Sequence, residues 1–201
     1  MREAALSQAR ALLGRAKNAL ARLKGSQSFE EAQEAWDQFL HTAHRVYPKL
    51  RAGAHETQSW AWFMRKLDDR KTDPLLEYLH QARNSDEHRL DSALLRNPAS
   101  LLIQAHRGSV QVDQVQLTAD GWHIGWRAVD QDAYITVSRH LAHLELMPVK
   151  NANRHTKVET IYPVPKSHRG KPIGGKSAYI VGTLAIIYLE DLLVEAESLL
   201  R

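Results

Sequence analysis

The sequence predicts an α+β protein, in which a helical bundle is interrupted by an antiparallel β-rich segment and completed by a C-terminal helix. Three observations predict this fold class. Apolar residues recur every three or four positions over residues 1–97, as on one face of a helix. Short runs of β-branched and aromatic residues then follow over residues 98–176. Helical spacing returns over residues 177–201, and we expect this last helix to pack on the bundle.

The first two predicted helices have clear ends. The helical spacing of the first runs from Glu3 to Leu23. Gly25 is predicted to end this helix, because glycine commonly follows the last turn of a helix. Ser28, with Glu31 three residues later, forms the capping-box pattern and opens the second helix. Pro48 marks a kink or an end in this helix, because proline cannot donate a backbone hydrogen bond.

Two further helices complete the predicted bundle. One runs from Ser59 to about Asp69. The next begins at Asp73-Pro74, where an N-cap aspartate precedes a proline at the first helical position, and it continues towards His88.

The middle of the chain is expected to form strands joined by turns. Pro163–Gly175, rich in Pro, Gly and Lys, is predicted to be a long loop. The predicted strands are Val110–Leu117, Trp122–Trp126, Ala133–Val137, His143–Val149 and Glu159–Val164.

The C-terminal segment has enough apolar side chains to require a partner surface. We expect it to bury one helical face against the bundle. The side chains assigned to that face are Ile180, Leu184, Ile187, Leu192 and Leu199.

Composition excludes some classes of protein. The 201-residue chain has no cysteine, so it has neither a disulfide framework nor a thiolate metal site. Its longest apolar run, Ile180–Leu189, is shorter than the roughly 20 residues of a membrane-spanning helix. The first 24 residues carry several Arg and Lys residues and lack the apolar core of a signal peptide. We therefore expect a cytoplasmic protein without membrane association.

Positive charge is concentrated near the C-terminal end of the predicted insertion. Residues 150–176 hold seven Lys and Arg residues against one acid, so they carry +6 while the whole chain carries +4. Such a patch could hold a polyanion, and a solvated loop is the alternative. The residues predicted to contact RNA or phosphate are Lys166, Arg169, Lys171 and Lys176.

The sequence RNSDEH at residues 83–88 is the most informative motif. On a helix, Asn84 and His88 share a face, and Arg83 flanks them. A histidine can take and return a proton at neutral pH, and an arginine can hold a phosphate through two hydrogen bonds. These residue types suit cleavage of a phosphodiester.

This motif resembles the Arg-x(4 to 6)-His motif of HEPN domains, which are helical modules found in bacterial ribonuclease toxins and RNA-cutting phage-defence proteins. The resemblance covers about residues 1–95 and includes the polar residue directly after the arginine. It implies a metal-independent endoribonuclease without a cofactor, whose composite active site forms in a homodimer. It also implies that His88 is the general acid or base, that Arg83 stabilises the phosphorane, and that Asn84 orients the histidine or the phosphate. An antitoxin or another regulatory protein is then a further expected partner.

Three other interpretations remain open. Arg83 and Glu87 could form an exposed ion pair one turn apart, with His88 only a polar helix-end residue. The helices could form a HEPN-like module that binds proteins without catalysis. Alternatively, residues 170–177, which match the pattern G-x-x-x-x-G-K-[ST], could bind a phosphate or nucleotide, although too few residues follow them for a complete nucleotide-hydrolysing fold.

Other side-chain groups favour structural roles. The pairs His41 and His44, and His140 and His143, have metal-ligand spacing but no convincing third ligand, so no metal site is predicted. The tryptophans could stack on bases, but core packing is the stronger expectation for Trp60, Trp62, Trp122 and Trp126.

Overall fold

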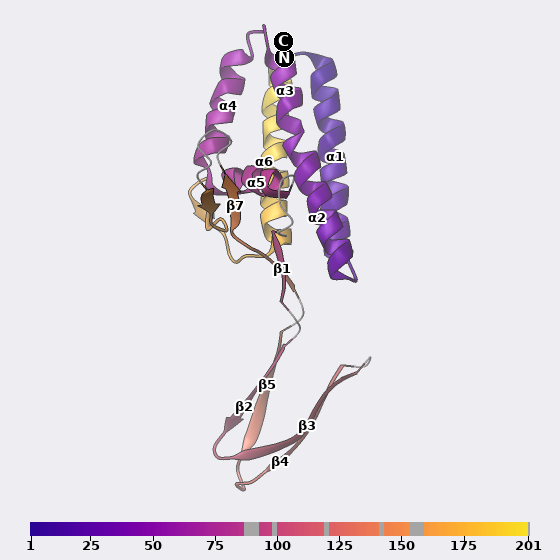
Figure 1. The fold of residues 1–201 in the computed structure, drawn as a ribbon, viewed down its shortest axis with the longest axis vertical. Coiled ribbons are helices and arrows are strands. Elements are labelled where there is room, and N and C mark those ends of the chain that lie inside the picture. Colours follow the sequence, from indigo (N-terminus) through magenta and orange to yellow (C-terminus); the bar gives the residue numbers. More distant parts are fainter. Residues whose placement is uncertain (87–92, 98–99, 119–120, 141–142, 153–158, 201) are drawn as a thin grey trace. The chain divides into compact units, whose positions relative to one another are not determined.

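The computed structural model describes residues 1–86, 93–97, 100–118, 121–140, 143–152 and 159–200. Over these residues the chain is a mixed α+β protein in which helices are combined with small antiparallel sheets (Figure 1). It divides into two compact units. The first unit comprises Met1–Arg96 and Leu144–Arg201, and the second comprises Asn97–His143. Residues 144–176, which we grouped with the β-rich insertion, therefore lie in the first unit.

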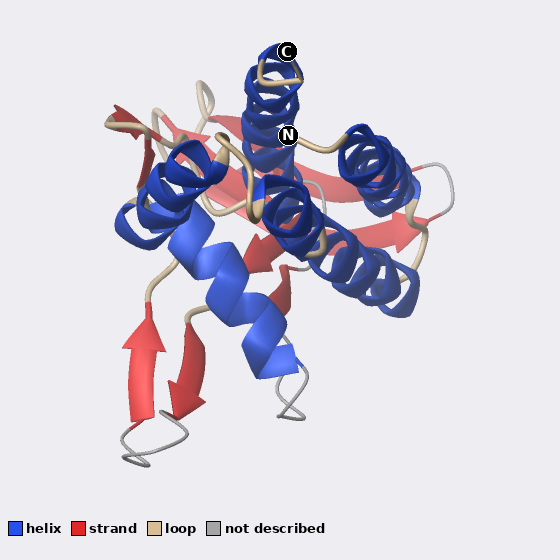
Figure 2. Ribbon diagram, turned by 90° about the horizontal axis from the view of Figure 1, so that it is seen from above, coloured by secondary structure: helices blue, strands red, loops and turns tan. Residues whose placement is uncertain are grey.

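Long helices dominate the first unit. α5 lies across the direction of α1 and α6, as both ribbon views show (Figures 1 and 2). None of the helices in the described part of the chain combines the length and apolar character that crossing a membrane requires. The helices are α1 (Glu3–Gly25), α2 (Phe29–His44), α3 (Val46–Ala54), α4 (Trp60–Thr72), α5 (Pro74–Asp86) and α6 (Ala178–Ser198).

Two of the helix starts, those of α2 and α5, have side-chain caps. The Ser28 hydroxyl accepts a hydrogen bond from the Glu31 amide at 3.1 Å, and the Glu31 carboxylate accepts one from the Gln27 amide at 2.9 Å. This is a capping box whose return bond falls one residue earlier than the pattern predicts. At α5, the Oδ1 atom of Asp73 accepts hydrogen bonds from the amides of Leu75 and Leu76 at 3.0 and 3.1 Å.

The break predicted near Pro48 lies a few residues earlier. α2 ends at His44 and α3 begins at Val46, so Pro48 is the third residue of a new helix. The first turn of a helix tolerates proline, because its amide groups have no carbonyl partner within the helix.

The core lies between α1, α2 and α6. Trp36 and Phe39 of α2 are fully buried, and their rings stack at 5.2 Å. α6 approaches α1 closely at Gly182, where a Cβ atom would lie 2.6 Å from Cδ1 of Leu20. The absence of a side chain at Gly182 therefore permits this contact.

The prediction of which face of α6 is buried was wrong in part. Leu192 is buried as expected, but Ile180 and Ile187 are 40% and 48% exposed. α6 is apolar on nearly every side, so its spacing does not define one face. The side chains that it buries are Ala178, Val181, Ala185, Ile186, Tyr188, Leu189, Leu192, Leu193 and Ala196.

Short strands connect α5 to α6. β1 (Leu94–Asn97) pairs with β6 (His143–Leu146), and β7 (Val149–Ala152) pairs antiparallel with β8 (Glu159–Tyr162). The strand predicted over 143–149 is thus two strands, interrupted at Met147-Pro148.

The long loop predicted over Pro163–Gly175 contains a hairpin of β9 (Ser167–His168) and β10 (Lys171–Pro172). Arg169 and Gly170 form its turn, with φ angles of 49° and 74°. Positive φ at both central residues is typical of a two-residue hairpin turn. The sequence indicates a turn at Gly170, but a positive φ angle at an arginine was not expected.

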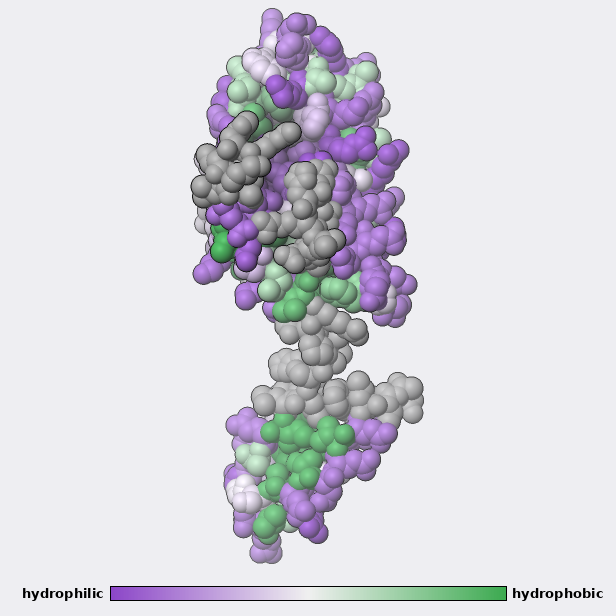
Figure 3. All heavy atoms as spheres, viewed as in Figure 1, coloured by the Kyte–Doolittle hydropathy of each residue, from purple (hydrophilic) through white to green (hydrophobic). Residues whose placement is uncertain are grey.

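The second unit consists of β2 (Ser100–His106), β3 (Val110–Thr118), β4 (Gly121–Ala128) and β5 (Tyr134–His140). β2 pairs antiparallel with β5, and β3 with β4. A bulge between Val112 and Gln114 keeps Val112 and Val115 on the same face as Trp126. All three side chains are exposed, and Figure 3 shows apolar surface on this unit. We did not predict β2, whose residues lack a clear period of two.

Candidate functional site

Arg83 and Asn84 of the RNSDEH motif lie near the end of α5. Nη1 of Arg83 donates a hydrogen bond to Oδ1 of Asn84 at 3.2 Å, and both residues are half-buried. Glu87 and His88 lie outside the described residues. The helix therefore brings two of the three predicted catalytic residues, Arg83 and Asn84, together. The third, His88, is not among the residues that the structure describes.

A different histidine contacts this pair. Nδ2 of Asn84 donates to Nε2 of His80, one turn earlier on α5, at 3.4 Å. The His80 ring stacks on His44 of α2, with centroids 5.2 Å apart and planes at 10°. We did not single out His80 from the sequence. Its four-residue spacing from Asn84 was the signal that could have identified it.

The environment of His80 favours the neutral ring. Burial, followed by the positive charges of Arg70 and Arg83, lowers the pKa of His80 to about 4. His80 is therefore uncharged at neutral pH, and two guanidinium groups act on the same imidazole. Arg70 reaches this region from α4, where its guanidinium lies 4.9 Å from the centre of the Tyr47 ring.

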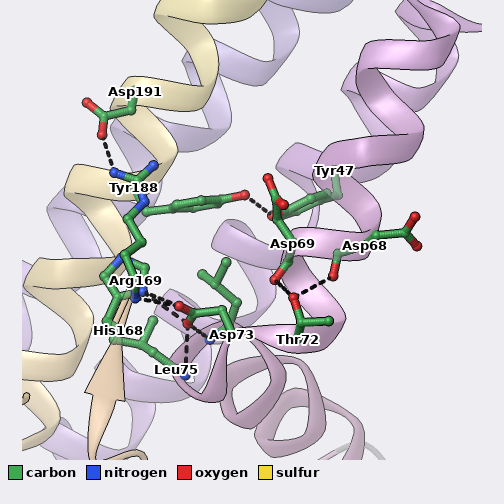
Figure 4. A network of polar contacts seen from close by, with 11 residues as sticks. Tyr47, Asp68, Asp69, Thr72, Asp73, Leu75, His168, Arg169, Tyr188 and Asp191 are labelled. Carbon is green, nitrogen blue, oxygen red and sulfur yellow. Dashed lines mark hydrogen bonds and ion pairs between the residues drawn. The ribbon is translucent and has the colours of Figure 1, made fainter. Parts of the chain in front are cut away.

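A second polar region lies at the other end of α5 (Figure 4). Besides capping α5, Asp73 accepts hydrogen bonds from Nδ1 of His168 at 3.0 Å and from the amide of Arg169 at 2.7 Å. Burial alone would raise the pKa of Asp73, but the hydrogen bonds from Arg169, His168 and Leu76 outweigh it and lower the pKa. Asp73 thus fixes the β9–β10 turn to the start of α5.

Arg169, predicted to contact RNA, is held in this region. Its guanidinium lies 4.8 Å from the centre of the Tyr188 ring and forms a 2.7 Å ion pair with Asp191 of α6. The Tyr188 hydroxyl accepts a hydrogen bond from the Tyr47 hydroxyl at 2.9 Å. Figure 4 shows Arg169 between Asp191 and Tyr188.

A cavity of about 410 Å³ adjoins these side chains, and its wall includes Arg169, Tyr188 and Lys66. Nζ of Lys66 lies 2.8 Å from Glu195 and 3.6 Å from Asp69. Burial opposes the charge on Lys66, but its hydrogen bond to Glu195 outweighs burial and raises its pKa. The cavity therefore presents cations that already have carboxylate partners.

The remaining predicted RNA-binding residues are exposed. Lys166 borders a groove of about 340 Å³ beside Tyr162, Lys171 lies on β10, and Lys176 precedes α6. With Arg169 they form a cationic surface on the segment that leads into α6.

The segment 170–177 has a backbone course unlike a phosphate-binding loop. Gly170 lies in the hairpin turn, the Ile173 amide donates to the Lys166 carbonyl at 2.9 Å, and the Gly175 amide donates to the Ile173 carbonyl at 3.0 Å. A phosphate-binding loop directs successive amides at its ligand. Two amides of this segment are instead used within the chain.

The histidine pairs and tryptophans have mainly structural surroundings. Nδ1 of His41 contacts the Asp37 carbonyl at 3.0 Å, and the side chains of His140 and His143 lie outside the described residues. Within the described part of the chain, three or more potential metal ligands do not cluster anywhere. Trp62 is buried and donates to Glu195 at 2.9 Å, as core packing predicts. Trp60 is half-buried, Trp126 is exposed, and the side chain of Trp122 is not described.

Comparisons with known proteins give no relative from which a function could be transferred. No protein-family model, curated protein or solved structure matches this chain.

Proposed function

We propose that this protein is a HEPN-like, metal-independent endoribonuclease of the toxin or defence type, which acts as a dimer. One observation carries the proposal. Arg83 and Asn84 lie side by side, joined by a hydrogen bond, on a helix of a helical unit. In HEPN domains, which the RNSDEH sequence resembles, the motif likewise belongs to a helical module.

The proposed reaction needs no group beyond the side chains of the motif. The 2′-hydroxyl attacks the adjacent phosphorus, the bond from phosphorus to the 5′ oxygen breaks, and the products carry a 2′,3′-cyclic phosphate and a 5′-hydroxyl. His88, as general base or acid, takes the proton of the 2′-hydroxyl or gives a proton to the leaving 5′ oxygen, and Arg83 stabilises the charge on the phosphorane. Asn84 orients Arg83, to which it is hydrogen-bonded.

The cationic surface supports RNA as the substrate class. Arg169 is fixed beside Asp73 at the start of α5, and Arg83 lies ten residues further along the helix. At 1.5 Å per residue this separation is about 15 Å, or a few nucleotides of an extended strand. We therefore propose that RNA extends from Arg83 towards the surface formed by Lys166, Arg169, Lys171 and Lys176.

The dimer and the regulator belong to the same proposal. Two copies of the motif would form the composite site, and an antitoxin or regulatory protein would control it in the cell. Gel filtration with light scattering tests the dimer, and a monomer that still cleaves RNA would exclude the composite site.

A non-catalytic interaction module is a second candidate, favoured by the exposed apolar face that includes Val112, Val115 and Trp126. The second unit contains three Arg and four Asp residues, so two copies would repel each other little. We propose a second copy of this chain as the partner of that face. Trp126→Ser should then weaken self-association, and unchanged association would exclude this surface.

Cleavage of labelled RNA in EDTA tests the ribonuclease. Wild-type protein should cleave, and Arg83→Ala or His88→Ala should lower the rate at least about 100-fold, because general acid–base groups and groups that stabilise charge in the transition state each typically contribute that much. Arg65→Ala and His55→Ala are matched controls at exposed positions and should cleave like wild type. No cleavage by the folded wild type of any of several RNAs would favour the interaction module.

A further inference from the structure

Asn84 is hydrogen-bonded to two other side chains of α5. Its Oδ1 atom accepts from Nη1 of Arg83 at 3.2 Å, and its Nδ2 atom lies 3.4 Å from Nε2 of His80. A side-chain amide has one oxygen and one nitrogen, so the contact with Arg83 decides which end of Asn84 faces the imidazole. The nitrogen faces it, and the three side chains form one chain of hydrogen bonds.

The contact with Asn84 requires one form of the His80 ring. The amide nitrogen of Asn84 can only donate, so Nε2 of His80 offers its lone pair and the proton of the neutral ring lies on Nδ1. A doubly protonated ring would set an N–H group against the amide N–H groups. Burial and the charges of Arg70 and Arg83 lower the pKa of His80 to about 4, so the ring is neutral at pH 7 and keeps this acceptor.

The position of the His80 ring is fixed from outside α5. The ring stacks on His44 of α2 with centroids 5.2 Å apart and planes at 10°. Nδ1 of His80 is buried and has no partner among the described residues, so no other contact there competes with Asn84 in setting the tautomer. A separation of 3.4 Å makes a weak hydrogen bond by itself, but a stacked ring cannot turn its acceptor away.

Arg83 is the residue whose direction this chain sets. Its guanidinium is planar, so a bond made by Nη1 also fixes the directions of the other N–H groups. Such donors stabilise a transition state only when they point at the oxygens that gain charge. The orientation of the Asn84 amide therefore bears directly on the chemistry proposed for Arg83.

We propose that His80 is a positioning residue of the ribonuclease: its Nε2 atom accepts from Asn84, and Asn84 directs the guanidinium of Arg83 towards the scissile phosphate. This inference rests on the proposed function and adds to it a residue outside the RNSDEH sequence. His80 itself neither contacts the RNA nor transfers a proton. Its substitution should therefore change the rate of the chemical step through Arg83.

NMR of wild-type protein with ¹⁵N-labelled histidine tests the hydrogen-bond chain without a substitution in it. The His80 resonances are assigned by their absence from the spectrum of His80→Gln. At pH 7, Nε2 of His80 should resonate as an unprotonated imidazole nitrogen and Nδ1 as a protonated one. Asn84→Ala removes the donor, and the preference for this tautomer should weaken. A proton on Nε2 in wild type would overturn the proposal, because two donors would then face each other.

Two substitutions of His80 separate the acceptor from the ring. His80→Phe keeps a ring to stack on His44 but has no acceptor, and should lower kcat for RNA cleavage about tenfold or more with little change in KM, because a misaligned group loses transition-state stabilisation. His80→Gln supplies an acceptor oxygen one turn before Asn84 and should cleave close to wild type. His55→Phe, at an exposed position, is the matched control. Equal rates for wild type and His80→Phe, or the same loss in both His80 variants, would overturn the positioning role.

The two measurements separate this inference from the proposed function. Wild-type protein that is folded but cleaves none of several RNAs would contradict the ribonuclease. The His80 tautomer would then decide by itself whether the chain that fixes Arg83 exists. Cleavage that is lost in Arg83→Ala but unchanged in His80→Phe would leave the ribonuclease intact and contradict the role of His80.

Discussion

Polar side chains at the start of α5 join segments that are far apart in the sequence, whereas those near its end contact one another within the helix. Asp73 bonds His168, which is 95 residues away, and Asn84 links Arg83 to His80 within the helix. Asp73 contributes to stability, whereas Arg83 and Asn84 belong to the proposed active site. Substitutions at the two ends of α5 therefore test stability and chemistry separately.

Asp73→Ala should lower the free energy of unfolding by about 2–4 kcal/mol, because α5 loses its cap and two donors of the β9–β10 turn, the buried His168 ring and the Arg169 amide, lose their acceptor. Asp73→Asn keeps an oxygen for the cap and should cost less. Urea unfolding measures both.

The control for this prediction is Asp191→Ala, which removes only an exposed ion pair with Arg169. Exposed pairs contribute about 0–1 kcal/mol, so this variant should remain close to wild type. A loss at Asp73 no larger than that at Asp191 would show that Asp73 does not anchor the turn.

His80 should make stability depend on pH. Its pKa is lowered from 6.5 to about 4, so the unfolded chain binds a proton at pH values where the folded chain does not. The free energy of unfolding should be unaffected by this group above about pH 6.5 and should fall by about 1–2 kcal/mol towards pH 4, allowing for partial exposure.

Urea unfolding of wild type and His80→Gln, at pH 7 and pH 4.5 in phosphate-free buffer, measures this effect. The variant should lose less stability between the two values, because glutamine does not titrate. An equal loss in both proteins would mean that His80 does not have the lowered pKa.

At the scale of elements, the contact between α1 and α6 depends on Gly182. Gly182→Ala places a methyl group 2.6 Å from Cδ1 of Leu20 and should destabilise the protein by about 1 kcal/mol or more. The control is Gly14→Ala, which places a methyl group in open space on α1 and should stabilise the protein by about 0.5–1 kcal/mol through helix propensity. Thermal unfolding of the two variants compares them, and a stabilised Gly182→Ala would contradict the close contact.

Helix spacing and caps were sufficient to predict where most helices begin. Ser28 and Asp73 act as the caps that their sequence context indicates. Spacing could not define the buried face of α6, where apolar residues surround the helix. It also missed the β9–β10 hairpin, because Arg169 adopts a positive φ that its residue type does not signal.

At the scale of the whole molecule, the sequence could predict the fold class but not which distant residues meet. The α+β class followed from the change of periodicity near residue 97. The stacking of His44 on His80, and of Arg169 on Tyr188, depends on how separate helices and turns pack. No local pattern encodes such contacts, so neither could be inferred beforehand.

The division into two units predicts that the first can fold without the second. Arg96 and Leu144 both belong to the first unit, and β1 pairs with β6 at this point. Replacing residues 97–143 by a short Gly-Ser turn should preserve the helical circular dichroism and cooperative unfolding, with a midpoint within about 5 °C of wild type. Loss of cooperative unfolding would show that the second unit is needed for the fold.

We propose that the RNSDEH motif cleaves RNA by attack of the 2′-hydroxyl. The most direct measurement is the identity of the product ends after incubation of the protein with a defined RNA and with the same RNA carrying single 2′-deoxy substitutions. We expect 2′,3′-cyclic phosphate and 5′-hydroxyl ends, with no cleavage where the 2′-hydroxyl is missing. Products with 3′-hydroxyl ends, or cleavage that persists at the 2′-deoxy position, would contradict it.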